Sequence, residues 1–127
     1  MEITTIFLAL LALMYLILAL RVSIIRPKVG ATIGNGKNET LTLAIRVHGN
    51  FAEYVPLLIF IMWLLEYNTA STWFLWVFGI ALVTGRISHA YGMWNAQTPD
   101  IARGVGMLIT YGLLLIGPLY LLYFAFT

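Results

Sequence analysis

Apolar residues form four long, continuous stretches along the chain. A helix that spans a membrane needs about 20 mostly apolar residues, and windows of this length fit at residues 3–25, 41–65, 73–94 and 101–126. Because lipid offers backbone groups no partners, only helices and closed barrels span a membrane, and barrel strands alternate apolar with polar residues. The pattern therefore predicts an all-α membrane protein, a single domain over residues 1–127 that folds as a four-transmembrane-helix bundle.

The composition also indicates a surface that faces lipid. Of the 127 residues, 61% are hydrophobic and 9% are charged, whereas an average globular chain has about 25% charged residues. A soluble domain of this size could not bury so much apolar side chain in one core. The chain has no cysteine, which excludes a disulfide scaffold and any thiol chemistry of its own. A thiol in a reaction of this protein must come from a ligand.

Basic residues gather at one end of the predicted bundle. Five of the seven flank or fill the connection between the first two stretches, and Arg103 follows a helix start marked by Thr98-Pro99-Asp100. The other end, at Glu2, Glu66 and the C-terminus, has no Lys or Arg. The positive-inside rule then predicts a cytoplasmic basic end, with the N and C termini outside, in the periplasm. The net charge of +2 reflects this topology, so no nucleic-acid partner is expected.

Polar and ionisable residues interrupt the second and third stretches. Such groups are costly within a membrane and usually face a bundle interior, a partner or a ligand cavity. Arg46, Asn50 and Glu53 are spaced by four and three residues, so they share one face of a helix, whereas His48 points elsewhere. A rise of about 1.5 Å per residue places Glu53 and Arg86 at similar depths. The spacing therefore predicts an ion pair between Glu53 and Arg86.

Several interpretations of these polar groups compete. A buried network that only holds helices together is common in membrane bundles. Haem ligation by His48 and His89 is weakly supported, because the two histidines lack axial spacing. Proton conduction is also weakly supported, because only Glu53 lies deep in a stretch. No metal site is expected, because the sequence does not cluster three or four convergent ligands.

An anionic ligand explains the balance of charges best. Arg46, Arg86 and Arg103 outnumber the deep acids, and unpaired buried cations are costly. Arginine suits carboxylates because its planar fork can donate two hydrogen bonds at once. Glu53 and Asn50 in the same cavity indicate that the ligand also has an amine or an amide. This mixture predicts a small zwitterionic peptide with more than one carboxylate.

Three segments resemble the bacterial branch of the MAPEG family, the membrane-associated proteins in eicosanoid and glutathione metabolism. They are IRVHGNFAEYVPLLI at 45–59, GRISHAYGM at 85–93 and ARGVGM at 102–107. The first motif is specific, because Arg, Asn, Glu and Pro have to coincide at fixed spacing within an apolar run. The resemblance implies a homotrimer of four-helix protomers in the bacterial inner membrane. It also implies glutathione bound at each subunit interface on the cytoplasmic side.

The resemblance assigns expected roles residue by residue. Arg103 matches the arginine that stabilises the thiolate, and is therefore the expected catalytic residue. The positions that match glutathione-binding residues are Arg46, His48, Asn50, Glu53, Tyr54, Arg86 and His89, with Arg21 or Arg26 for the arginine of the first helix. The chain departs from the family at Gly104, where the prostaglandin-synthase branch has serine, and at Met93, where eukaryotic relatives have tyrosine. Tyr91 lies on another face and does not replace that tyrosine.

The implied chemistry is activation of the glutathione thiol. A free thiol is mostly protonated at neutral pH, and an arginine at a helix N-terminus favours the thiolate. The resemblance thus implies a membrane-bound, glutathione-dependent transferase or peroxidase. Its substrates would be lipophilic electrophiles or hydroperoxides, with glutathione as co-substrate and no metal. The alternative is a non-catalytic trimeric membrane binding or scaffold protein that retains the fold. Arg103 and the complete motif at 45–59 favour the enzyme, whereas the missing serine and tyrosine keep the alternative open.

Overall fold

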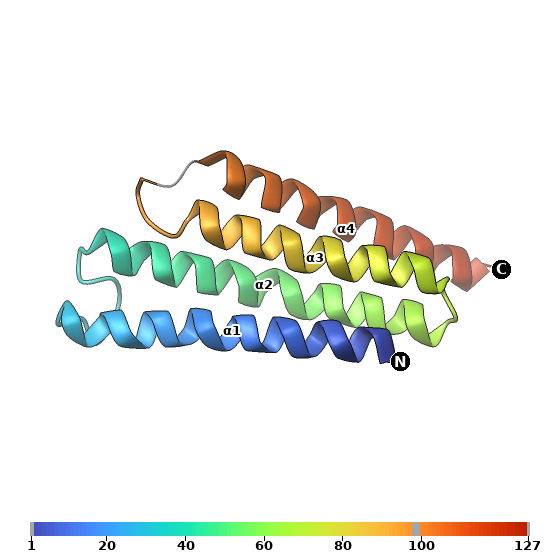
Figure 1. Cartoon of the computed structure of the whole chain (residues 1–127), viewed down its shortest axis with the longest axis horizontal. Helices are drawn as coiled ribbons and strands as arrows, with labels where there is room; N and C mark the ends of the chain where they lie inside the picture. The colour runs from blue at the N-terminus through green and yellow to red at the C-terminus, as the bar shows by residue number, and fades with distance from the viewer. Residues whose placement is uncertain (1, 98–99, 127) are drawn as a thin grey trace.

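The structure, a computed structural model, describes residues 2–97 and 100–126 and contains four long helices that run up and down in a bundle (Figure 1). Their bounds are Glu2–Lys28 for α1, Glu39–Tyr67 for α2, Thr72–Gly92 for α3 and Asp100–Phe126 for α4. No strand occurs in these described ranges. All four helices are long and apolar enough to cross a membrane. This confirms the predicted all-α architecture.

Each helix end lies within three residues of its prediction. α2 shows why the ends differ. It begins at Glu39, after the N-cap residue Asn38, whose side chain accepts a hydrogen bond of 2.9 Å from the backbone N–H of Leu41. These first residues are polar because they satisfy the free N–H groups of the helix start, and an apolar window misses them. The helix start predicted at Thr98 and Pro99 lies outside the described residues.

α2 and α3 hold the bundle together. Each of them packs against all three other helices, whereas α1 and α4 do not contact each other in the described part of the chain. Figure 1 shows these two helices at opposite edges of the bundle. Leu58, Met62 and Leu65 of α2 are fully buried and form much of the core with Phe78 and Leu82 of α3.

Both chain termini lie at one end of the bundle (Figure 1). The opposite end carries the loop between α1 and α2 and the connection between α3 and α4. We call it the basic end, because it holds Arg21, Arg26, Lys28, Lys37, Arg46 and Arg103.

Glu66 ties the start of α1 to the end of α2. Its carboxylate accepts hydrogen bonds from the backbone N–H groups of Ile3 at 3.0 Å and Thr4 at 2.9 Å. The first N–H groups of a helix have no partner within the helix, and a negative charge beside them interacts favourably with the helix dipole. The contact fixes α1 against α2 at the end of the bundle away from the basic end.

Glycines allow α3 and α4 to approach closely near the basic end. A Cβ atom built on Gly106 would lie 2.6 Å from the backbone N of His89, and one built on Gly92 would lie 2.9 Å from the Cα of Arg103. Ser88 of α3 adds a hydrogen bond of 2.7 Å from its hydroxyl to a backbone carbonyl of α4. This close packing holds the first turns of α4, and with them Arg103, against the end of α3.

Gly106→Ala is expected to destabilise the folded protein by about 1–3 kcal/mol, because the added methyl group overlaps the backbone of α3. Gly112→Ala is the matched control on the same helix, since a Cβ there meets no atom within 4 Å and alanine has the higher helix propensity. Thermal unfolding in mild detergent, followed by circular dichroism, compares the two variants. Equal unfolding midpoints would contradict the close packing of α3 and α4.

Candidate functional site

A pocket of about 420 Å³ opens between α2, α3 and α4 near the basic end. Its lining mixes charged, polar and apolar side chains: Ile45, Arg46, Gly49, Asn50, Glu53 and Tyr54 from α2, His89 and Met93 from α3, and Arg103, Met107 and Tyr111 from α4. Two larger grooves on α1, of about 500 and 640 Å³, are lined almost entirely by apolar side chains. The charged pocket is therefore the candidate site.

The α2 wall of the pocket is the face that the residue spacing predicts. Arg46, Asn50 and Glu53 all line the pocket. Val47, which follows Arg46, and Phe51, which follows Asn50, are buried in the core. Because apolar residues fix the rotation of α2 about its axis, the polar side chains are directed into the pocket.

Arg86 lies inside the bundle beside the pocket, with 1% of its surface exposed. Its Nη1 donates a hydrogen bond of 2.8 Å to Oδ1 of Asn50, and its Nη2 donates one of 2.7 Å to Oγ1 of Thr110. The predicted ion pair with Glu53 is wrong. Depth along the helix axis puts Glu53 and Arg86 level, but rotation about the axis directs Glu53 to the exposed side of α2 and Asn50 to Arg86.

The Arg86 guanidinium is therefore a buried charge with neutral partners. Besides Asn50 and Thr110 it approaches the carbonyl oxygen of Gly106 at 3.5 Å, and its Nε has no hydrogen-bond partner among the described residues. A buried cation without a counterion is costly, and it raises the positive potential of the space next to it. That space is the pocket. Arg86 is connected to it by Asn50, which lines the pocket and accepts the hydrogen bond from Arg86.

The other charges of the pocket are available to a ligand. Arg103 pairs with Asp100 at 3.5 Å, but both side chains are largely exposed, and exposed pairs of this kind contribute little. Arg46 and Glu53 form no ion pair with any residue in the ranges that the structure describes. The pocket thus offers two guanidinium groups at its open end and one carboxylate further in. This arrangement suits a zwitterionic ligand that also carries carboxylates.

Besides Arg86, three of the predicted site residues lie outside the pocket of their own chain. His48 is on another side of α2, where its ring lies 4.8 Å from the ring of Tyr15. Arg21 donates a hydrogen bond to the backbone carbonyl of Trp94 and stacks over its ring. Arg26 donates a hydrogen bond of 3.0 Å to a carbonyl of the loop between α1 and α2.

The two histidines do not converge on a common ligand. His48 lies against α1, whereas His89 lines the pocket and is buried between α3 and α4. This separation does not support a haem between them. Across residues 2–97 and 100–126, no group of three or more His, Asp or Glu side chains is placed to hold a metal ion.

Met107 and Tyr111 are pocket residues that the sequence prediction misses. Both follow Arg103 along α4 at intervals of four residues, so the same spacing rule that finds the polar face of α2 would find them. The ring of Tyr111 lies edge-on to that of Tyr54, with centroids 6.1 Å apart. Met93 lines the pocket as well, while Tyr91 is 59% exposed and lines a groove on α1 instead.

Comparisons with known proteins agree with the motifs and the fold. The chain is 41% identical over 68 residues to the inner membrane protein YecN of Escherichia coli K12 and to its counterpart in Escherichia coli O6:H1. This alignment covers 54% of the chain and about half (52%) of the length of either relative. No solved structure shows significant similarity to the chain. The profile of the MAPEG family matches residues 4–123, which include nearly all of the four helices, and the chain belongs to this family.

Proposed function

We propose that the protein binds glutathione in the pocket between α2, α3 and α4 and activates its thiol for reaction with lipophilic electrophiles or hydroperoxides. One observation carries the proposal: Arg46, Asn50 and Glu53 converge with Arg103, far along the chain, on a single pocket. Membership of the MAPEG family, whose proteins act in glutathione and eicosanoid metabolism, supports it.

The charges of glutathione match those of the pocket. Glutathione has two carboxylates, one ammonium group and two peptide groups besides its thiol. Arg46 suits a carboxylate through paired hydrogen bonds, and Glu53 suits the ammonium group. Because Oδ1 of Asn50 accepts a hydrogen bond from Arg86, its amide N–H groups remain to donate to a peptide carbonyl. Arg86 is thus a positioning residue for Asn50.

Arg103 has the position that thiol activation requires. It lies in the first turns of α4, where the free N–H groups and the helix dipole also favour a negative charge. A thiolate held there attacks an electrophilic carbon, forms a carbon–sulfur bond and expels the leaving group. With a hydroperoxide it attacks the outer oxygen, which breaks the O–O bond, releases the alcohol and leaves a glutathione sulfenic acid. A second glutathione condenses with this sulfenic acid to give glutathione disulfide and water. Orientation and thiol activation supply the catalysis.

The lipophilic substrate would enter from the bilayer. Tyr54, Met107 and Tyr111 form the less polar, deeper part of the pocket, and Tyr111 is 53% exposed on the outer surface of α4. A substrate dissolved in lipid can reach this part without crossing the charged opening. Met93 lines the pocket where eukaryotic relatives have a tyrosine. Tyr111 supplies a tyrosine hydroxyl to the same pocket from α4.

The proposed assembly is a homotrimer in the bacterial inner membrane, with the basic end in the cytoplasm and both termini in the periplasm. The positive-inside rule supports the orientation, and the name of the E. coli relatives supports the location. His48 and Arg26 lie outside the pocket of their own chain. They can contribute to glutathione binding only from a neighbouring protomer, as a site at the subunit interface would require.

Glutathione titrations by calorimetry in mild detergent test the binding proposal. Glu53→Gln is expected to weaken glutathione binding roughly tenfold or more, because it removes a charged hydrogen-bond partner of the ammonium group. Binding of an analogue that lacks the amino group should be unchanged by the same substitution. Glu39→Gln, on α2 but outside the pocket, is the control. Equal losses of the two ligands on Glu53→Gln would contradict the assigned role of Glu53.

A further inference from the structure

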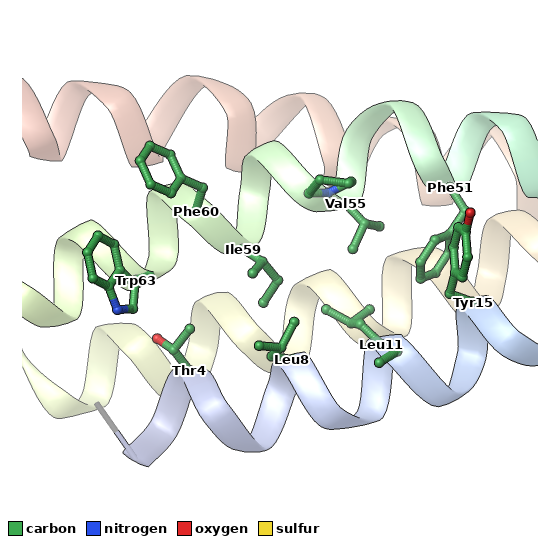
Figure 2. A pocket seen from close by; sticks show the side chains of 11 residues that line it. Thr4, Leu8, Leu11, Tyr15, Phe51, Val55, Ile59, Phe60 and Trp63 are labelled. Carbon is green, nitrogen blue, oxygen red and sulfur yellow. The ribbon is translucent and has the colours of Figure 1, made fainter.

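Two apolar grooves flank α1, and neither shares a lining residue with the glutathione pocket. One, of about 640 Å³, lies between α1 and α3 and runs from Leu10 to Leu18 on α1. The other, of about 500 Å³, lies between α1 and α2. Figure 2 shows it, with Leu8 and Leu11 of α1 facing Val55 and Ile59 of α2. The two grooves differ in what lies at their ends.

A positively charged side chain, that of Arg21, lies at one end of the α1–α3 groove. Trp94 lines its end at the basic end of the bundle, and the guanidinium of Arg21 lies over the Trp94 ring, 4.0 Å from the ring centroid. Nη1 of Arg21 is buried without a hydrogen-bond partner among the described residues. Arg26 and Lys28 follow in the last turns of α1, and the helix has no acidic residue after Glu2.

The distance along α1 from Leu10, where the groove begins, to Arg21 matches the thickness of one leaflet of a bilayer. Leu10 and Arg21 are eleven residues apart, which corresponds to about 16 Å along a helix. Half of a hydrocarbon core is about 15 Å thick. Tyr91 and Trp94 lie at the charged end of the groove, and tyrosine and tryptophan are typical of the level of the lipid headgroups. The groove thus extends from the middle of the membrane to the headgroup level.

We propose that the α1–α3 groove is a binding site for an anionic phospholipid of the leaflet at the basic end. One acyl chain lies between α1 and α3, and the phosphate binds Arg21, with Arg26 and Lys28 close by. Nη2 of Arg21 already donates to the carbonyl of Trp94, so Nη1, which has no partner among the described residues, is the group left to donate to a phosphate oxygen. A charged hydrogen bond of this kind is strong, and basic residues at this level attract anionic headgroups. This assignment gives Arg21 a role that the glutathione pocket does not, and it does not depend on the proposed catalytic function.

The α1–α2 groove supplies an internal comparison. Its lining includes Thr4 and Tyr15 among apolar residues. Neither groove has a cationic side chain in its own lining, but Arg21 lies over Trp94 at the end of the α1–α3 groove. Figure 2 shows Thr4 and Trp63 at one end and Tyr15 with Phe51 at the other. Without a cation to bind the phosphate, this groove has no reason to prefer an anionic lipid. Any preference of the whole protein for anionic lipid should therefore depend on Arg21.

Native mass spectrometry of the full-length protein in mild detergent tests the proposal, with phosphatidylglycerol and phosphatidylethanolamine of identical acyl chains as probes. The wild-type protein is expected to retain phosphatidylglycerol about fivefold better. Arg21→Gln should abolish the preference, and Leu13→Trp, which fills the groove while Arg21 stays in place, should lower retention as well. Lys37→Gln, in the exposed loop at the same end, should retain the preference.

Circular dichroism reports whether each variant is folded, because Arg21 also bonds the end of α3 through Trp94. Equal retention of the two lipids by the wild-type protein would overturn the proposal. A preference that persists in folded Arg21→Gln would overturn the role of Arg21. Loss of the preference in Arg21→Gln alone, with Leu13→Trp unchanged, would overturn the groove as the site of the acyl chain.

Discussion

Arg103→Ala is expected to lower turnover of a lipophilic electrophile by roughly 10²- to 10³-fold, the usual effect of removing a group that stabilises developing negative charge. The loss of glutathione affinity should be much smaller, because Arg46 and Glu53 remain in the pocket. In the proposed function, Arg103 acts on the thiolate, whereas the other two bind parts of glutathione that do not react. Steady-state kinetics with a chloronitrobenzene as electrophile measure both effects as kcat and KM.

Arg46→Ala is the matched control, since it removes the same charge from the same pocket. It should raise the KM for glutathione and change kcat far less than the Arg103 substitution does. Equal effects of Arg103→Ala on turnover and on affinity would argue against stabilisation of a thiolate by Arg103.

Arg86→Ala is expected to destabilise the protein by about 2–5 kcal/mol, because it removes a large, fully buried side chain and leaves a cavity. It also leaves Oδ1 of Asn50 without the hydrogen bond that it accepts from Arg86. Glu53→Ala should keep an unfolding midpoint near that of the wild type, since Glu53 is exposed and pairs with no described cation. Thermal unfolding of the two variants in the same detergent makes the comparison.

The comparison of these two variants distinguishes a hydrogen bond between Arg86 and Asn50 from an ion pair between Arg86 and Glu53. An ion pair between Glu53 and Arg86 would make Glu53→Ala destabilising by about 3–5 kcal/mol, because the substitution would leave a buried cation without its partner. Equal destabilisation by Glu53→Ala and Arg86→Ala would therefore support the ion pair between Glu53 and Arg86 that residue depth predicts. It would contradict the contact between Arg86 and Asn50.

Much of the fold can be predicted from the sequence because lipid leaves a chain few choices. A run of about 20 apolar residues in a membrane must form a helix, so four runs predict four helices and their approximate ends. Polar caps such as Asn38 lie outside an apolar window and shift the observed start of α2. The close approach of Gly106 to His89 depends on which faces of α3 and α4 meet, and periodicity alone does not determine that.

The candidate site is predictable to a lesser degree. Spacing along α2 correctly groups Arg46, Asn50 and Glu53, because positions three and four apart share a helix face. The partner of Arg86 is missed, since an estimate of depth contains no information about rotation. Motif matching marks Arg21 as a site residue, but it cannot show that Trp94 binds its guanidinium. Such contacts follow from tertiary packing.

Formation of a glutathione thiolate at Arg103 is tested most directly by a titration of glutathione into the purified protein in mild detergent while the ultraviolet absorbance of the thiolate is followed. The wild-type protein should give a saturable thiolate signal. Arg103→Ala should give none, although calorimetry still detects glutathione binding. Glutathione binding to the wild-type protein without any thiolate signal would contradict thiol activation and would identify the pocket as that of a non-catalytic binding protein.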